Sequence, residues 1–355
     1  MPRSSSPVSG VPRFVRRPLA RWRQRLRTVG RQRHVWSAQW RAERDLERVV
    51  LGDHPILVGP WCSEVGYEVL YWVPFLRWVM AAYRVAPERV TVMSRGGAAP
   101  WYEGLSARYV DAFEFVSPDD LARRAQAGTH KQIEPTAFDD ALGRRAAEAL
   151  GLQGMRQLHP ALLFRWLGPY WSGHETLGFA ERHTRHARIA PPTDLPCPSL
   201  PDTYVAVKLY AARALPDTAQ VRAQVDALLS ALAERLPVVL LETGFDVDEH
   251  ADWRVASGTP VIRVRDAMTP RINLALQTQI IGGAKLFVGT CGSLAWLAPL
   301  LGVTTIALFT DPSFLHAHLH FARRAYGRLD AGAFHPTDLG GLIAAGLGVT
   351  ARVAP

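Results

Sequence analysis

Residues 286–303 read LFVGTCGSLAWLAPLLGV: an apolar run, a short stretch of small residues and a second apolar run. The first run predicts a buried β-strand that ends at Gly289, and Ser293 stands where the N-cap of a helix would be. A helix start carries unpaired backbone N–H groups and the positive end of the helix dipole, so it suits a phosphate ligand. An ordinary turn between a strand and a helix has the same small residues, and this alternative stays open.

Strands and helices are predicted to alternate on both sides of this stretch. The strands are continuous apolar runs, which is typical of a parallel sheet covered by helices on both faces. Ligands bind such sheets beyond the carboxyl ends of the strands. The predicted strands are 204–209, 238–241, 261–264, 286–288 and 304–308, and the predicted helices are 218–235, 271–281 and 293–301.

A second βαβ pattern precedes this one. Residues 56–58 and 90–93 are short apolar strands, and the periodicity of residues 65–83 predicts a helix between them. Pro74 falls inside that helix and should kink it or mark its first turns. Two amphipathic segments follow, around residues 105–115 and 139–150.

The chain of 355 residues, 48% of them apolar, is long enough for two domains with a cleft between them. We expect a basic amphipathic arm at 1–48, an N-terminal Rossmann-like domain at 49–165, a Pro-rich linker at 166–202 and a C-terminal Rossmann-like domain at 203–355.

The positive charge is concentrated at the N-terminus. Thirteen arginines and three acidic residues give residues 1–48 a net charge of +10, so the rest of the chain carries −1 of the total +9. Within residues 13–44 apolar side chains recur along one stripe and arginine fills most other positions, which favours a helix lying on an anionic membrane surface. A disordered arm, or a helix docked on the body or on a second copy, is the alternative. No nucleic-acid motif follows, so no nucleic-acid partner is expected.

The three cysteines, Cys62, Cys197 and Cys291, are far apart in the sequence. This spacing argues against a disulfide framework and against a metal site of paired cysteines. No apolar run reaches the roughly 18 to 20 residues that span a bilayer. We therefore expect a cytoplasmic protein, soluble or peripheral on the inner face of the membrane.

Lysine is scarce: the chain has three lysines against 38 arginines. Lys208 ends the first predicted strand of the second domain, where a compact ammonium would face the cleft as a counter-charge for phosphate. A solvated strand end is the simpler alternative.

The stretch 286–303 resembles part of the donor-binding domain of the heptosyltransferase-like, family 9 glycosyltransferases. Their strand, loop and helix carry an Asp-Ser/Thr-Gly core followed by an apolar helix and Gly-Val-Pro; here Cys291 and Gly292 stand near the Asp and the Gly, and Thr304 replaces the Pro. The resemblance covers residues 204–310 and a second patch at 55–80. The segments EVGYE, YVAVKLY and FVGTCGS are also similar to a bacterial glycosyltransferase-like group.

The resemblance implies the GT-B fold, two Rossmann-like domains facing a cleft, and transfer of a sugar from a nucleotide-sugar donor to a hydroxyl of a glycan or lipid-linked acceptor. One acidic residue after strand 238–241 would meet the ribose or base. The implied donor site comprises Lys208, Glu242, Asp248, Glu249, Thr290, Cys291, Gly292, Ser293 and Leu294. Asp246-Val247-Asp248 also matches the metal-binding signature of the GT-A class, but it lies in the second βαβ series and three-letter matches arise by chance. We therefore expect neither a metal nor a cofactor.

Transfer to a hydroxyl requires a carboxylate or a histidine that takes the proton. Residues 68–74, EVLYWVP, resemble the family segment DVLHTLP. The resemblance implies that Glu68 is the catalytic base. Glu64, one turn earlier, is a rival, and both carboxylates could instead stabilise a helix start. The expected reaction is a single, inverting displacement. Another group transfer on the same frame, such as pyruvyl transfer, and a non-catalytic membrane-associated scaffold stay open.

Overall fold

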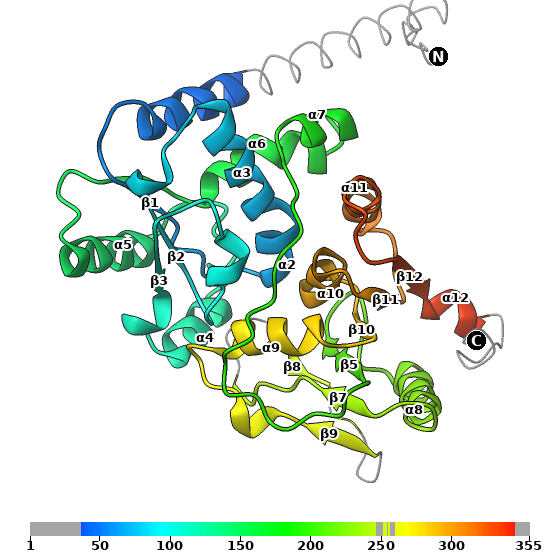
Figure 1. Ribbon diagram of the computed structural model, residues 1–355. Helices are drawn as coiled ribbons and strands as arrows, with labels where there is room; N and C mark the ends of the chain where they lie inside the picture. The colour runs from blue at the N-terminus through cyan, green and yellow to red at the C-terminus, as the bar shows by residue number, and fades with distance from the viewer. Residues whose placement is uncertain (1–36, 246–250, 254, 256–259, 345–355) are drawn as a thin grey trace, which may run out of the picture.

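The computed structural model describes residues 37–245, 251–253, 255 and 260–344. Over these residues the chain is α/β, with two larger parallel sheets in two domains that lie against each other (Figure 1). The predicted pair of Rossmann-like domains is confirmed. No helix in the described part of the chain is long and apolar enough to cross a bilayer.

The first sheet has four strands in the order β3-β2-β1-β4, all parallel. Its strands are β1 (Ile56–Val58), β2 (Val90–Ser94), β3 (Arg108–Asp111) and β4 (Arg156–Leu158). The helical segments between them are α2 (Val65–Tyr67), η1 (Glu68–Trp72), α3 (Val73–Ala82), η2 (Pro87–Arg89), η3 (Ala99–Tyr102), η4 (Ala112–Glu114), α4 (Pro118–Gln126) and α5 (Ala137–Leu150). The amphipathic segment expected around 105–115 contains β3, an edge strand whose first residue, Arg108, is exposed.

The second sheet has six parallel strands in the order β12-β11-β10-β5-β7-β9. Counted from β5 this is the order 3-2-1-4-5-6 of a doubly wound sheet, and the order reverses between β5 and β10. Its strands are β5 (Val205–Lys208), β7 (Val238–Leu240), β9 (Val261–Arg263), β10 (Leu286–Thr290), β11 (Thr304–Phe309) and β12 (Phe334–Asp338). The remaining elements are β6 (Tyr210–Ala211), α8 (Ala219–Ala233), β8 (Ala251–Asp252), η5 (Arg265–Ala267), α9 (Asn273–Gly282), α10 (Ser293–Leu297), η6 (Ala298–Leu301), α11 (His316–Gly327) and α12 (Leu339–Ala344).

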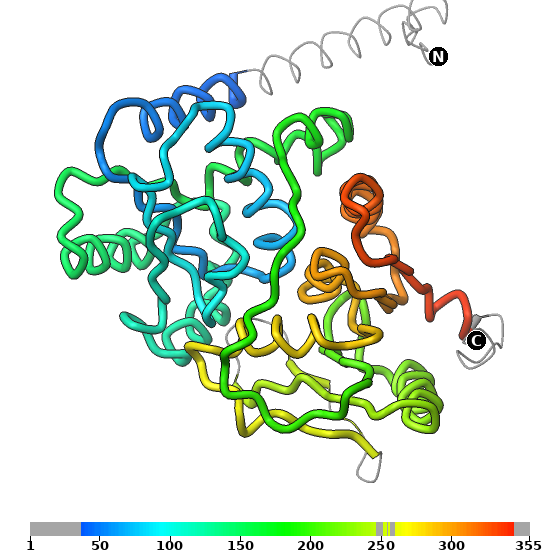
Figure 2. Tube along the Cα trace, viewed as in Figure 1, coloured from blue at the N-terminus to red at the C-terminus, as the bar shows by residue number. Residues whose placement is uncertain are grey.

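The predicted linker, 166–202, contains the end of α6 (Ala161–Trp171) and all of α7 (Leu177–Arg182). Beyond α7 the chain runs without helix or strand along both domains to β5 (Figure 2). α11 packs against α7, so the C-terminal part of the chain returns to the first domain.

Residues 37–50 form a helix that overlaps the predicted arm. Ala42, Leu46 and Val50 on this helix are buried in the core, so this part of the arm belongs to the folded body. The arm before residue 37 lies outside the described residues.

The two domains share one apolar core and are joined by hydrogen bonds. The carbonyl of Gly96, after β2, accepts the N–H groups of Leu274 at 2.8 Å and of Ala275 at 3.0 Å. Trp101 Nε1 donates to Thr278 Oγ1 at 3.0 Å. The first domain thus satisfies N–H groups at the start of α9, which no intrahelical carbonyl can reach.

A π-helical segment, η1, joins α2 to α3, and the N–H of Val73 donates to the carbonyl of Glu68, five residues earlier. Pro74, near the start of α3, has no N–H to offer the carbonyl of Leu70. His186 Nε2 donates to that carbonyl instead, at 3.0 Å. The predicted helix 65–83 therefore changes geometry at the proline, as expected.

Candidate active site between the domains

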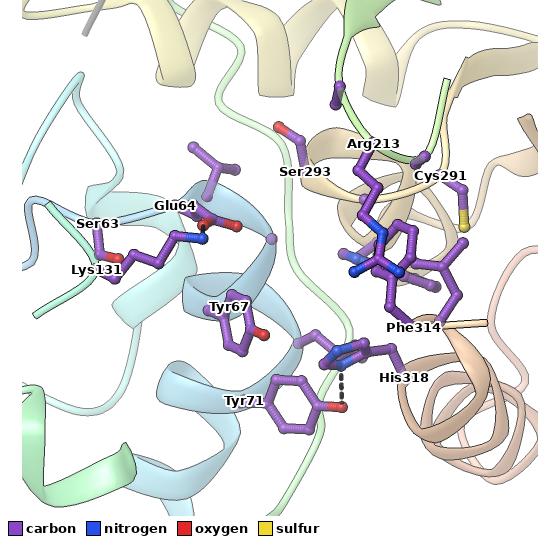
Figure 3. Close-up of a pocket in the computed structure, with 18 of the residues that line it drawn as sticks. Ser63, Glu64, Tyr67, Tyr71, Lys131, Arg213, Cys291, Ser293, Phe314 and His318 are labelled. Carbon is purple, nitrogen blue, oxygen red and sulfur yellow. Dashed lines mark hydrogen bonds and ion pairs between the residues drawn. The ribbon is translucent and has the colours of Figure 1, made fainter. Parts of the chain in front are cut away.

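A cleft of about 650 Å³ lies between the two domains. One wall comes from the chain after β1, from α2 and η1, and from the loop that holds Lys131; the other comes from the chain after β5 and β10 and from the start of α11 (Figure 3). Both walls include chain that leaves the carboxyl ends of parallel strands, where α/β sheets bind ligands. The volume suits a small-molecule ligand.

Glu64 is the carboxylate on the first wall of this cleft. It precedes α2 with an extended backbone (φ −64°, ψ 133°), and its side chain is 19% exposed. Lys131 Nζ lies 3.6 Å from Glu64 Oε1. The carboxylate is therefore accessible from the cleft and is oriented by a neighbouring ammonium.

The loop that holds Lys131 is tied to the chain after β1 by buried hydrogen bonds. Gln132, the next residue, accepts the N–H of Cys62 at 2.8 Å through Oε1. Its Nε2 donates to Asp139 Oδ1 at 2.7 Å. Because the segment 60–64 and the loop are fixed to each other, Lys131 stays opposite Glu64.

Asp139 anchors this network inside the first domain. Its side chain is fully buried and lies 2.8 Å from Arg124, which is also buried. Burial alone would raise the pKa of Asp139, but the neighbouring His159 and the charge of Arg124 outweigh it and lower that pKa. Asp139 thus carries a charge that is compensated within the domain.

Glu68, the first candidate for the base, does not line the cleft. Its side chain is fully buried and accepts hydrogen bonds from Ser94 Oγ and, at 2.5 Å, from Tyr102 OH. Burial raises the pKa of Glu68 to about 7, against the opposing effect of these hydrogen bonds. The segment η1 is buried along its whole length, and Glu68 at its start points toward β2. Of the two predicted carboxylates, Glu64 is the one on the cleft surface.

Lys208 lies at the end of β5, beside the point where the strand order reverses, as predicted. Its Nζ donates to Asp252 Oδ1 at 2.5 Å, and Asp252 Oδ2 accepts the N–H of Thr243 at 2.9 Å. Lys208 also lines a smaller cavity of about 60 Å³ together with Arg95 and Ser293. A phosphate bound here would compete with Asp252 for the ammonium.

The predicted phosphate loop, residues 290–294, follows β10 next to Lys208. Thr290 Oγ1 accepts the N–H of Tyr210 and donates to its carbonyl, both at 3.0 Å, so Thr290 fastens two strand ends. Gly292 (φ 139°) has no room for a side chain, because a Cβ would lie 2.6 Å from Tyr210 OH. Ser293 starts α10 and lines both cavities.

The other predicted donor residues have different surroundings. Cys291 and Leu294 are buried, and burial raises the pKa of the Cys291 thiol to about 12, so it stays protonated. Glu242 follows β7 and pairs with Arg263 on β9 at 2.5 Å. Asp248 and Glu249 lie outside the described residues. Among the residues that are described, no cluster of three His, Cys, Asp or Glu side chains could hold a metal ion.

Three cleft residues that were not singled out from the sequence are Tyr71, Lys131 and Arg213. Tyr71 OH and His318 Nδ1 lie 2.7 Å apart across the domain interface (Figure 3). The Arg213 guanidinium stacks over Phe314 at 4.4 Å. The scarcity of lysine, which drew attention to Lys208, applies equally to Lys131. The aromatic and arginine residues carried no comparable signal, because loops and helix faces set their positions.

No family profile matches the chain, and no curated protein matches it. Similar solved structures include the iron-containing dodecameric glycosyltransferase TibC of enterotoxigenic E. coli H10407 (14% identity, 72% of this chain, 58% of TibC, TM-score 0.40). Another is the family 9 glycosyl transferase of Veillonella parvula DSM 2008 (12% identity, 86% of this chain, 91% of that protein, TM-score 0.43). A third is the E. coli ADP-heptose LPS heptosyltransferase II (14% identity, 74% of this chain, 87% of that protein, TM-score 0.36). The chain thus spans less than two thirds of TibC's length.

Proposed function

We propose that the protein is a GT-B glycosyltransferase that moves a sugar from a nucleotide-sugar donor to a hydroxyl of a glycan or lipid-linked acceptor. One observation carries the proposal: Glu64 faces a cleft whose other wall holds Ser293, beside Lys208 at the reversal of strand order. A carboxylate can take the acceptor proton, while an ammonium and backbone N–H groups stabilise the departing diphosphate.

In the proposed mechanism the acceptor oxygen attacks the anomeric carbon from the side opposite the diphosphate. The new glycosidic bond forms as the donor bond breaks, so the configuration inverts. The acceptor proton goes to Glu64, and the electron pair of the broken bond goes to the diphosphate. Lys208 and the backbone N–H groups at the start of α10 stabilise that charge, so no step of the mechanism calls for a metal.

For the nucleotide we propose the region beyond β7 and β9. Thr243 and Phe245 lie there on the same small cavity as Lys208. One of Glu242, Asp248 and Glu249 would bind the ribose. If it is Glu242, the ribose replaces its present partner, Arg263.

We also propose that the protein is cytoplasmic and peripheral on an anionic membrane. A groove on the helix 37–50 supports this: Arg44 stacks on Trp40 at 4.7 Å, and Trp40 is 57% exposed. The groove is lined by four arginines and one aspartate, namely Arg41, Arg44, Arg48, Arg165 and Asp45. Arginine around an exposed tryptophan favours an interface with anionic lipid.

A nucleotide-sugar panel tests the central proposal. We expect one nucleoside diphosphate to raise the Tm of the protein and the matching nucleotide-sugar to release free nucleoside diphosphate when an acceptor is present. Release of inorganic phosphate from phosphoenolpyruvate would indicate pyruvyl transfer instead. A protein that binds no nucleotide in calorimetry would be a scaffold.

A further inference from the structure

The two ends of the cleft differ in polarity. Near the ends of β1 and β10 the lining includes four polar side chains, Ser63, Glu64, Lys131 and Ser293, beside Val65 and Ile133. Toward α6 and α11 the cleft is lined by rings that contact one another, contributed by Tyr67, Tyr71, Phe164, Trp171 and His318, and by the ring of Phe314. We refer to these six residues as the aromatic wall.

The aromatic wall presents mainly ring carbon to a ligand, and its polar atoms are Tyr67 OH, Tyr71 OH, Trp171 Nε1 and the two nitrogens of His318. Tyr71 OH and His318 Nδ1 already bond to each other at 2.7 Å. Burial lowers the pKa of His318 to about 4, so its ring is neutral at physiological pH. A sugar leaving water must find partners for its hydroxyls, and each one left unpaired costs affinity. An apolar group has no such requirement, so the wall suits an apolar group better than a sugar.

The Arg213 guanidinium lies between the polar end and the aromatic end of the cleft (Figure 3). The Arg213 side chain is 68% exposed and stacks on Phe314 of the wall, 3.5 Å from Asp311. An exposed guanidinium held flat on an aromatic ring suits a phosphate at this border.

The aromatic wall also continues toward the basic groove on helix 37–50. Phe164 and Trp171, both on α6, belong to the wall. Arg165, next to Phe164, pairs with Asp45 of that groove at 2.6 Å. A chain leaving the cleft along α6 would therefore meet an arginine-rich surface.

From these observations we infer that the acceptor is an anionic amphiphile: a hydroxyl-bearing head group linked through phosphate to an apolar chain. The chain lies on the aromatic wall, the phosphate beside Arg213, and the head group at Glu64. This inference rests on the proposed function and decides between its two acceptor classes.

Calorimetry on the full chain tests the inference with geranyl phosphate, below its critical micelle concentration, and methyl phosphate. Wild type should bind geranyl phosphate at least tenfold more tightly. Trp171→Ala should remove most of this difference in affinity and leave the affinity for methyl phosphate unchanged within about twofold. Arg213→Gln should weaken the binding of both ligands. Trp78→Ala is the matched control, because Trp78 is half-buried like Trp171 but lines neither the cleft nor the basic groove. Phe164→Ala gives the same test at another half-buried position of the wall if Trp171→Ala does not fold.

Equal affinities for the two phosphates would overturn the inference, and so would tighter binding of 1-naphthyl phosphate, which would indicate a flat aromatic acceptor. Nucleoside diphosphate binding, measured on the same preparation, separates this failure from failure of the proposed function. If the diphosphate binds but geranyl phosphate binds no more tightly than methyl phosphate, the proposed glycosyltransferase function stands and the amphiphilic acceptor is wrong.

Discussion

The first strands of the two sheets, β1 and β5, have corresponding places but opposite chemistry. Each lies at the reversal of strand order in its own sheet, and the chain beyond each enters the domain interface. Beyond β1 the cleft receives a carboxylate, Glu64, whereas β5 ends on an ammonium, Lys208. Under the proposed function, one topology used twice provides a proton-accepting side and an anion-binding side, and the residue near each strand end decides between these two roles.

The largest effect is expected at the proton-accepting side. Glu64→Gln should lower kcat for sugar transfer by about 10²- to 10⁴-fold, because it removes the base and keeps the shape of the side chain. Steady-state kinetics at saturating acceptor measures this. Glu68→Gln is the control, and a greater loss of kcat in that variant, with an intact fold, would return the base role to Glu68.

The second prediction concerns the charge buried in the first domain. Asp139→Ala should lower the free energy of unfolding by about 3 to 5 kcal/mol, because it leaves the Arg124 guanidinium buried without its carboxylate. Urea unfolding followed by circular dichroism gives the value. Asp120→Ala, which removes an exposed pair with Arg123 in the same domain, should cost at most about 1 kcal/mol. Equal losses in the two variants would show that burial of the pair is unimportant.

A third prediction follows from the pKa of Glu68, which burial raises from 4.5 to about 7. Between these values the folded state binds more protons than the unfolded state, so stability is full below about pH 4.5 and falls as the pH rises toward 7. The loss attributable to this group is at most about 3 kcal/mol. Unfolding free energies measured across this range should fall in wild type and fall less steeply in Glu68→Gln. Parallel slopes in the two proteins would mean that Glu68 titrates normally.

The smallest effect is expected at the anion-binding side. Lys208→Ala should weaken binding of the cognate nucleoside diphosphate by about 10- to 100-fold, because it removes a charged donor in a partly buried site. Calorimetry measures the affinity. Lys285→Ala, at an exposed position before β10, is the matched control and should bind as wild type. If both variants bind equally well, the diphosphate lies elsewhere.

Much of the fold is local enough to follow from the sequence. Strands β5, β7 and β10 are largely buried along apolar runs, and the predicted helix 218–235 begins at its N-cap Thr218, whose side chain accepts the N–H of Val221. The edge strands β9 and β12 are partly exposed, and β12, which has no apolar run, was not predicted. The position of Lys208 also follows, because a residue that ends a parallel strand must lie at the ligand-binding edge.

The choice between Glu64 and Glu68 shows where such reasoning ends. A spacing of four residues places two side chains on one face only if both lie within a regular helix. Glu64 precedes α2 with extended backbone, and Glu68 begins a π-helical segment, so the two carboxylates point to different surroundings.

The sequence by itself determined the two Rossmann-like units, the small-residue loop after β10 and the lysine beside it, because strand runs and turn residues act over a few positions. Only the tertiary structure decided which carboxylate reaches the cleft, and only it brought Lys131, Arg213 and the aromatic wall to the site. These side chains come from loops and from α2, η1, α6 and α11, which are far apart in the chain. They meet because two domains bury a common core, and no local pattern encodes that contact.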